Sequence, residues 1–133
     1  MDIINSRPQT AVAPSDWFTG TVYIDGLTAA DMPSRLHAFR VHFTPAARTV
    51  WHSHPHGQLL HITDGVGRVQ SRGAPARQVA AGDTIRFEPG EEHWHGAAPG
   101  NFMTHIAFQM ADEDGTDVTW GEAVSDDEYS TVG

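Results

Sequence analysis

Two short histidine segments are the residues of this 133-residue sequence best suited to chemistry. The first is His52-Ser53-His54, which is followed by Gln58, and the second contains His93 and His95. Side chains at positions i and i+2 of a β-strand project from the same face, so both imidazoles of each pair would point in one direction. Imidazole nitrogens together with an amide oxygen suit a divalent first-row metal ion and leave coordination positions open for a substrate.

A single His-x-His pair on a strand is more often a packing or surface feature than a metal site. The second pair changes this balance, because several imidazoles on an inward face without a metal would leave buried polar groups unsatisfied. The segment Pro55-His56-Gly57 predicts a chain reversal that places Gln58 close to His54 on the returning strand. We therefore predict one metal site, with a third imidazole supplied by the second pair.

The segments that must position these histidines are predicted to be short strands, separated by glycine or proline turns. No segment before residue 111 carries a helical period. This pattern predicts an all-β sandwich or barrel in a single domain. We expect strands at residues 17–24, 36–43, 48–54, 58–63, 67–71, 78–80, 83–87, 93–97 and 102–110.

The two ends of the chain differ from this strand-rich middle. Residues 1–15 are polar with two prolines and are expected to form an extended arm, whereas residues 16–110 would form the β-barrel. Residues 111–133 hold 8 of the 17 acidic residues and form an acidic tail. Within this tail we expect a short strand at 118–120 and a helical turn with Ser125 as its N-cap.

The composition excludes several classes of function. The chain has 8 basic residues, all arginine, against 17 acidic ones, and its formal net charge is -9. Such a field would repel nucleic acid and anionic membranes, so we expect neither as a partner. The lack of cysteine excludes disulfides, thiolate metal sites and a cysteine nucleophile.

Neither a membrane span nor a secretion signal is predicted. No apolar run approaches the ~18 residues that a membrane helix needs. The N-terminal segment lacks the basic start and the apolar stretch of a signal peptide. We therefore expect a cytoplasmic protein whose partner is a small-molecule substrate.

The spacing of the first histidine pair resembles the first motif of the cupin superfamily. That motif contains a His-x-His pair, then a glutamate and then a glycine, and His52-Ser53-His54, Gln58 and Gly65 stand at these places. Gln58 replaces the usual glutamate, and Ala46 stands near the place of a leading glycine.

The second cupin motif is matched by Gly82, Pro89-Gly90 and His93, while Ala97 stands where the family has asparagine. The resemblance to cupins implies a double-stranded β-helix, or jelly-roll, barrel that holds a metal ion inside.

A closer resemblance covers nearly the whole chain and points to the small bacterial manganese-dependent cupin hydroxynitrile lyases, the (R)-mandelonitrile lyase-like cupins. It is carried by residues 16–22, 47–58, 89–99 and 103–105 and by the closing Trp120, Glu128 and Tyr129. It implies metal ligands at His52, His54, Gln58 and His93 and a general base at His105. It also implies a divalent metal, Mn(II) before Fe(II), Ni(II) or Zn(II), and a homodimer or homotetramer.

The reaction implied by this resemblance is cleavage of a 2-hydroxynitrile, such as mandelonitrile, into benzaldehyde and cyanide, or its reverse. Because Gln58 is neutral, the site would keep the full charge of the ion and be a stronger Lewis acid toward a hydroxyl. His105 would take the hydroxyl proton, and His95, which shares a face with His93, would be a second proton carrier or a substrate orienter. We expect the pocket to be lined by Phe39, Val41, Leu60 and Gln109. Phe39 would narrow the pocket, because the family has small residues at this place.

Two other functions remain open from the sequence. One is an Fe(II)-dependent dioxygenase acting on a small molecule, which would consume oxygen. The other is a non-catalytic cupin that binds a sugar or a small acid, which would be stabilised by its ligand without turnover.

The remaining aromatic and histidine residues are expected to have other roles. Trp51, Trp94 and Phe108 should face away from the ligands and pack between sheets or subunits. We expect Trp17, Phe18 and Trp120 in the core or at an interface, Arg48 as an anchor for the acidic tail, and His37, His42, His56 and His61 as non-ligands.

Overall fold

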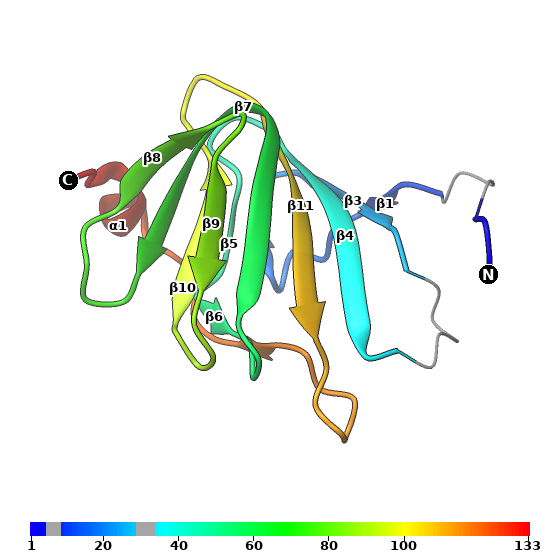
Figure 1. The fold of residues 1–133 in the computed structure, drawn as a ribbon. Coiled ribbons are helices and arrows are strands. Elements are labelled where there is room, and N and C mark those ends of the chain that lie inside the picture. Colours follow the sequence, from blue (N-terminus) through cyan, green and yellow to red (C-terminus); the bar gives the residue numbers. More distant parts are fainter. Residues whose placement is uncertain (5–8, 29–33) are drawn as a thin grey trace.

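A computed structural model describes residues 1–4, 9–28 and 34–133. It shows a strongly curled antiparallel sheet that encloses much of a barrel, with one short helix near the C-terminus (Figure 1). The strands lie side by side in the order β1-β3-β4-β11-β7-β10-β5-β2, and β6, β8, β9 and β12 pair beside this path. The elements are β1 (Ala11–Val12), β2 (Phe18–Thr19), β3 (Val22–Gly26), β4 (Leu36–Phe43), β5 (Arg48–Thr49), β6 (His52–Ser53), β7 (Gln58–Ser71), β8 (Arg77–Ala80), β9 (Thr84–Phe87), β10 (His93–Ala97), β11 (Met103–Met110), β12 (Thr119–Trp120) and α1 (Asp126–Ser130). The predicted all-β fold is confirmed.

The long strand β7 joins the two sides of the curled sheet. Its first half pairs with β11 and β9, and its second half pairs with β10 and β8. It arches over the top of the molecule in Figure 1. The prediction that two strands are separated at Asp64-Gly65 is wrong, because the chain bends there without ending the strand. Gly65 has a φ of 81°, and a Cβ atom at this position would lie 1.8 Å from the carbonyl oxygen of Phe102, so only glycine fits this bend.

Two predicted strands are interrupted in the structure. The segment 48–54 is divided into β5 and β6, because the main chain of Trp51 pairs with the C-terminal segment instead. Trp51 N donates to Glu122 O at 2.8 Å, and Gly121 N donates to Trp51 O at 2.7 Å. The segment 17–24 is divided into β2 and β3 at Gly20, whose φ is 82°. A long-range contact interrupts the first predicted strand, and a turn at Gly20 interrupts the second.

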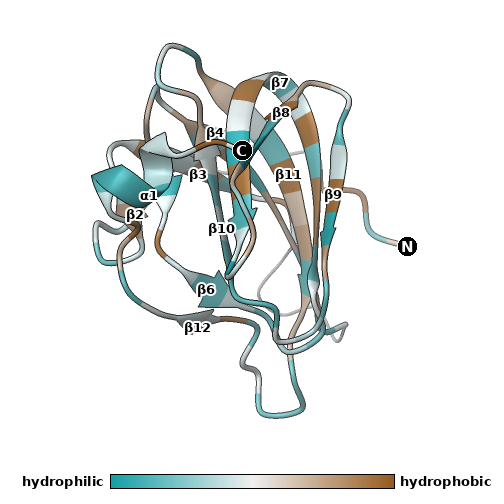
Figure 2. Ribbon diagram, turned by 90° about the vertical axis from the view of Figure 1, so that its left-hand side faces the viewer, coloured by the Kyte–Doolittle hydropathy of each residue, from teal (hydrophilic) through white to brown (hydrophobic). Residues whose placement is uncertain are grey.

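The inward faces of the strands build the main core, and brown and teal segments alternate along β7 and β11 in Figure 2. This alternation follows from the period of two along a strand. The buried residues of this core are Phe18, Val22, Val41, Phe43, Ala47, Leu60, Ile62, Val69, Val79, Phe87, Ala97, Met103 and Ala107. A second cluster, formed by Trp51, Ala76, Trp94, Val124 and Tyr129, lies at the C-terminal helix. Trp51 and Trp94 therefore pack away from the barrel interior, as predicted.

The C-terminal segment is fastened to the ligand-bearing side of the sheet. Ser125 caps α1, and its side chain accepts a hydrogen bond from Glu128 N at 3.1 Å. The Tyr129 hydroxyl donates to Ala97 O at 2.6 Å. Arg48 donates to Val124 O and to the Asp126 carboxylate, both at 2.9 Å, so the predicted role of Arg48 as an anchor for the tail is confirmed.

None of the helical residues in the described ranges forms a segment with the length and hydropathy that a membrane crossing needs.

The close approach of β10 to β5 predicts that Gly96→Ala destabilises the fold. A Cβ atom on Gly96 would lie 2.4 Å from the carbonyl oxygen of Ala47 and 2.5 Å from Cβ of Arg48. We expect a loss of about 1–3 kcal/mol in the free energy of unfolding, measured by urea denaturation, because such overpacking forces the backbone to shift. Gly26→Ala, where a Cβ meets nothing within 4 Å, is the matched control and should keep the midpoint or raise it slightly, because alanine loses less backbone freedom on folding. Equal stability of both variants would contradict this account of the β5–β10 contact.

Candidate metal centre

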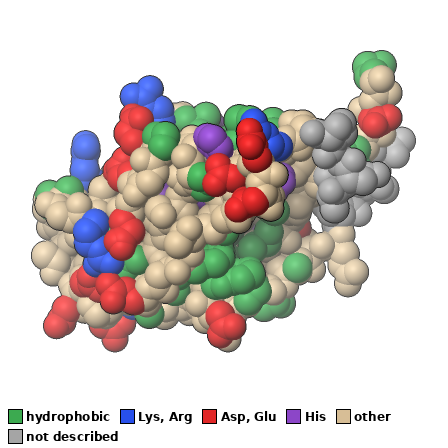
Figure 3. All heavy atoms as spheres, turned by 90° about the horizontal axis from the view of Figure 1, so that it is seen from below, with side chains coloured by type: hydrophobic (Ala, Val, Ile, Leu, Met, Phe, Trp, Pro, Cys, Tyr) green, Lys and Arg blue, Asp and Glu red, His purple; other side chains and the backbone are tan. Residues whose placement is uncertain are grey.

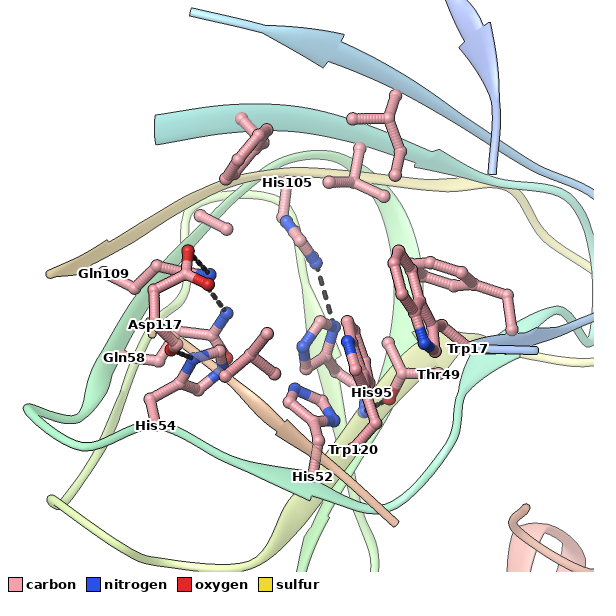
Figure 4. A pocket seen from close by; sticks show the side chains of 16 residues that line it. Trp17, Thr49, His52, His54, Gln58, His95, His105, Gln109, Asp117 and Trp120 are labelled. Carbon is pink, nitrogen blue, oxygen red and sulfur yellow. Dashed lines mark hydrogen bonds between the residues drawn. The ribbon is translucent and has the colours of Figure 1, made fainter. Parts of the chain in front are cut away.

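A cavity of about 260 Å³ lies inside the curled sheet (Figure 4). One of its sides is polar and carries histidine and glutamine side chains, and another side is aromatic. It is lined by Trp17, Phe18, Ile24, Phe39, Val41, Thr49, His52, His54, Gln58, His95, His105, Ala107, Gln109, Asp117, Val118 and Trp120. Residues from the N-terminal and the C-terminal part of the chain therefore line the same cavity as the histidines.

The predicted ligands come from three neighbouring segments and converge. His52 lies on β6 and pairs in register with His93 on β10, while Gln58 begins β7. The ring centroids of His52, His54 and His93 lie 4.4 to 5.5 Å apart. All four side chains are buried, with at most 6% of the residue exposed. The structure thus brings together every residue of the ligand set expected at His52, His54, Gln58 and His93.

The three imidazoles share one pattern of hydrogen bonding. His52 Nδ1 lies 2.8 Å from Val50 O, His54 Nδ1 lies 2.7 Å from Asp117 O, and His93 Nδ1 lies 2.8 Å from Glu91 O. A carbonyl oxygen only accepts, so each Nδ1 carries the hydrogen and donates. Each Nε2 is then left with a lone pair, which is the tautomer that metal-binding histidines adopt when their other nitrogen is held by a carbonyl.

Burial keeps these rings neutral. It lowers the pKa of His93 to about 4 and holds the pKa of His52 well below its ordinary value. Burial also lowers the pKa of His54. A neutral imidazole presents its lone pair to a cation, so the electrostatics of the site favour metal binding over protonation.

One contact brings two acceptor atoms together. His93 Nε2 and Gln58 Oε1 lie 2.8 Å apart, and both atoms are acceptors once His93 donates through Nδ1. The amide nitrogen of Gln58 donates elsewhere, to Gln109 Oε1 at 2.9 Å. Within the described part of the chain, His54 Nε2 is buried and also has no hydrogen-bond partner. Facing lone pairs and an orphaned buried nitrogen are costly unless a cation satisfies them.

His95 offers a further nitrogen to the same region. One ring nitrogen from each of His52, His93 and His95 lies within 4.8 Å of the others, so these three histidines are also placed to hold a metal ion. The ring stacking of Phe87 on His93, with centroids 3.6 Å apart, limits the rotation of that imidazole.

His95 and His105 form a second buried pair beside the ligands. His105 Nε2 and His95 Nδ1 lie 3.0 Å apart, and Phe43 packs against both rings. Burial lowers the pKa of His105 to about 3 and the pKa of His95 well below its ordinary value. The low pKa values make both rings weak bases, so the pair can accept a proton only from a bound group that has itself become strongly acidic.

The pocket residues expected from the sequence agree with the cavity at three of four positions. Phe39, Val41 and Gln109 line it. The prediction that Leu60 lines the pocket is wrong, because Leu60 is not among the residues that line the cavity. Its inward position on β7 was correct, because Leu60 is fully buried in the main core.

An aromatic wall was not anticipated as part of the site. Trp17 and Trp120 stack with centroids 5.0 Å apart and planes 9° apart, and Phe18 lies beside Trp120. All three line the cavity, and Phe18 also belongs to the main core, as expected. They come from opposite ends of the chain, so no local pattern indicates their contact. Asp117 and Val118 were missed for the same reason, and Thr49 was missed although it lies only three residues before His52.

The other histidines form hydrogen bonds or ion pairs with side chains. His56 pairs with Asp112 at 3.0 Å, and His61 contacts Thr84 at 2.9 Å. His42 lies 3.0 Å from the Asp25 carboxylate and His37 lies 2.8 Å from the Asp117 carboxylate. These four imidazoles are not among the residues that line the cavity.

Comparison with known proteins finds the same architecture. Residues 39–106 match the family described as the cupin domain. A curated (R)-mandelonitrile lyase from Granulicella tundricola is 49% identical over 116 residues, which cover 87% of this chain and 88% of that protein. A cupin-like protein from Thermotoga maritima has a TM-score of 0.84 and 38% identity, and the match covers 96% of this chain and 95% of that one. A polyketide cyclase from Streptomyces resistomycificus, with a TM-score of 0.73 and 17% identity over 97% of this chain and 91% of that one, shows the fold alone.

The lone pair on His54 Nε2 predicts that His54→Ala weakens metal binding. At a free Mn²⁺ concentration of 100 times the Kd, we expect the wild type to gain about 2.7 kcal/mol in unfolding free energy. The variant should lose most of this gain, measured as the Mn²⁺-dependent shift in Tm. His61→Ala, which removes a solvent-exposed imidazole, is the matched control and should keep the shift. An equal Mn²⁺ shift in wild type and His54→Ala would count against His54 as a ligand.

Proposed function

This chain belongs to the cupin family, and on that premise we propose that it is a metal-dependent lyase that cleaves a 2-hydroxynitrile into a carbonyl compound and hydrogen cyanide. The reverse addition would use the same site. The observation that carries the proposal is the convergence of three neutral imidazole nitrogens and one amide oxygen beside a pair of neutral imidazoles. The 49% identity with an (R)-mandelonitrile lyase supports this choice of reaction.

His52, His54 and His93 would hold the metal through Nε2, and Gln58 would hold it through Oε1. All four donors are neutral, and we propose Mn(II), while Fe(II), Ni(II) and Zn(II) accept the same donor types. A divalent ion in this place would supply Lewis acidity, which lowers the pKa of a substrate hydroxyl. The surrounding main-chain carbonyls would keep the three rings in the required tautomer.

The His95–His105 pair would move the proton of the reaction. The hydroxyl proton passes to this pair, where the 3.0 Å contact between His105 Nε2 and His95 Nδ1 lets the two rings share it. The oxygen electrons form the C=O bond, and the electrons of the broken C–C bond leave on the cyanide carbon. The proton then passes to cyanide, so the products are one carbonyl compound and one molecule of HCN. No electron acceptor is consumed.

The shape and polarity of the cavity favour an aryl substrate such as mandelonitrile, which yields benzaldehyde. The stacked rings of Trp17 and Trp120, together with Phe18, offer an apolar wall for the aryl group. The molecule carries a formal charge of -9, and carboxylates surround an apolar area on the face shown in Figure 3. A neutral hydroxynitrile is not repelled by this field, whereas an anionic substrate would be.

The first prediction from this proposal concerns the proton carrier. His105→Gln keeps a polar side chain beside His95 but removes the basic imidazole. We expect kcat/KM for mandelonitrile cleavage to fall by about 10²- to 10⁴-fold, because a positioned base typically contributes this much. Release of benzaldehyde by the Mn²⁺-loaded protein is measured by its ultraviolet absorbance, with metal content determined in parallel.

His61→Ala serves as the control and should keep wild-type activity. Full activity of metal-loaded His105→Gln would contradict the role of His105. Oxygen uptake without cyanide release from the loaded wild type would contradict the lyase and favour a dioxygenase. Binding of mandelonitrile without turnover would favour a non-catalytic cupin.

The second prediction concerns the width of the cavity. Phe39 lines the pocket from β4, directly opposite Ala107 on β11. Phe39→Ala should raise kcat/KM for mandelonitrile relative to acetone cyanohydrin by at least about tenfold, since small volume changes in a pocket shift selectivity by this order. Phe102→Ala removes an exposed ring that is not part of the cavity lining and should leave this ratio unchanged. An unchanged ratio in Phe39→Ala would mean that Phe39 does not restrict the aryl group.

A further inference from the structure

A chain of three polar side chains leads from the metal centre to the C-terminal segment. Gln58 Nε2 donates to Gln109 Oε1 at 2.9 Å, and Gln109 Nε2 donates to Asp117 Oδ2 at 2.9 Å. His37 Nδ1 lies 2.8 Å from the same carboxylate oxygen. Figure 4 shows Gln58, Gln109 and Asp117 gathered on one side of the cavity, with dashed lines marking their hydrogen bonds.

The carboxylate gives this chain its direction. A carboxylate oxygen only accepts hydrogen bonds, so Gln109 must turn its NH₂ group toward Asp117 and its oxygen toward Gln58. Gln58 must then turn its own NH₂ group toward Gln109. Its oxygen is left facing the imidazoles, 2.8 Å from His93 Nε2.

This direction matters because the two ends of an amide are chemically opposite. Rotated by half a turn, Gln58 would present two N–H donors to the metal position and could not bind a cation there. A glutamate ligand has no such ambiguity, since both of its oxygens are acceptors. Because position 58 carries an amide in place of the usual carboxylate, the side chain of Gln58 must be held with its oxygen toward the metal position.

Asp117 also contacts one of the ligands directly, through its main chain. Its carbonyl oxygen accepts the hydrogen bond from His54 Nδ1 at 2.7 Å, which fixes the tautomer of that imidazole. The Asp117 side chain is mostly buried, with 18% of its surface exposed. One residue of the C-terminal segment is thus linked to the ligand set twice, directly to His54 and through Gln109 to Gln58.

We propose that Asp117 is a positioning residue that fixes the amide of Gln58 with its oxygen toward the metal, acting through Gln109. The inference rests on the proposed metal centre and adds a role for the segment between β11 and β12. It predicts that metal binding by this protein depends on Asp117, because the ligand at position 58 is an amide.

The first test compares Mn²⁺ affinity in the full-length wild type and in Asp117→Asn. Asparagine has nearly the same shape and leaves the main-chain carbonyl for His54 in place. It can both donate and accept, so the polar chain can run in either direction. Half-turned Gln58 would then donate its NH₂ group to His93 Nε2, 2.8 Å from the present Oε1 position, and become the main form of the metal-free protein, which raises the apparent Kd in proportion. We expect the Kd for Mn²⁺, measured by competition with a fluorescent chelator, to rise by about 10- to 100-fold, the usual cost of losing a group that orients a metal ligand.

Asp112→Asn is the matched control on the same segment, because Asp112 pairs with His56 away from the cavity. Its Kd should equal that of the wild type. The Tm of each metal-free variant should stay close to the wild-type value. If Asp117→Asn does not fold, Gln109→Met removes the same link from the middle of the chain and should raise the Kd to the same extent.

The second test separates orientation from a simple loss of charge or of packing. Asp117→Asn is repeated in a Gln58→Glu background, where the ligand is a carboxylate with no wrong orientation. We expect the Kd to change by less than about threefold in this background, or to improve. A purely structural role, or the mere loss of one negative charge, would weaken binding equally in both backgrounds.

Three results would overturn the inference. These are an equal loss in both backgrounds, a wild-type Kd in Asp117→Asn, and a wild-type Kd in Gln109→Met. The first leaves the metal centre intact, because wild type still binds Mn²⁺. A wild type that binds no Mn²⁺ would instead overturn both the proposed function and the inference.

Discussion

The histidine site depends on hydrogen bonds that point away from it. His52, His54 and His93 each donate Nδ1–H to a main-chain carbonyl, which leaves three Nε2 lone pairs directed among buried side chains. Burial prevents these nitrogens from being satisfied by protonation, since charging an imidazole in this environment is costly. The main-chain carbonyls therefore orient the three rings so that their lone pairs can bind a cation.

The carbonyls that hold these rings come from two kinds of structure. His52 and His93 each bond to the carbonyl two residues earlier, at Val50 and Glu91, so a local feature of the ligand segments fixes both rings. His54 bonds instead to Asp117, far along the chain. The segment after β11 is thus part of the site. Its attachment through β12 and α1 holds Asp117 beside His54. This is why Trp120 and Asp117 lie at the cavity rather than on a solvated tail.

The sequence predicted those features that depend on local period and turn chemistry. The bounds of β4 and β10 match the expected strands, and the i, i+2 spacing correctly placed His52 and His54 together. It failed where long-range contacts decide, as at Trp51, whose pairing with the C-terminal segment divides the expected strand. Leu60 shows a different limit, because alternation predicts which face is inward but not whether an inward side chain reaches a cavity. The stack of Trp17 on Trp120 joins residues from both ends of the chain, and a single sequence offers no local pattern for such a contact.

The central claim is that the lone pairs of His52, His54 and His93 and the oxygen of Gln58 converge on one metal ion. Anomalous diffraction from crystals of the Mn²⁺-loaded protein, measured on both sides of the manganese edge, tests it most directly. The account predicts one anomalous peak per chain, in direct contact with these three Nε2 atoms and with Gln58 Oε1. A peak bound by His95 in place of His54, or no peak in protein that has been loaded, would contradict it.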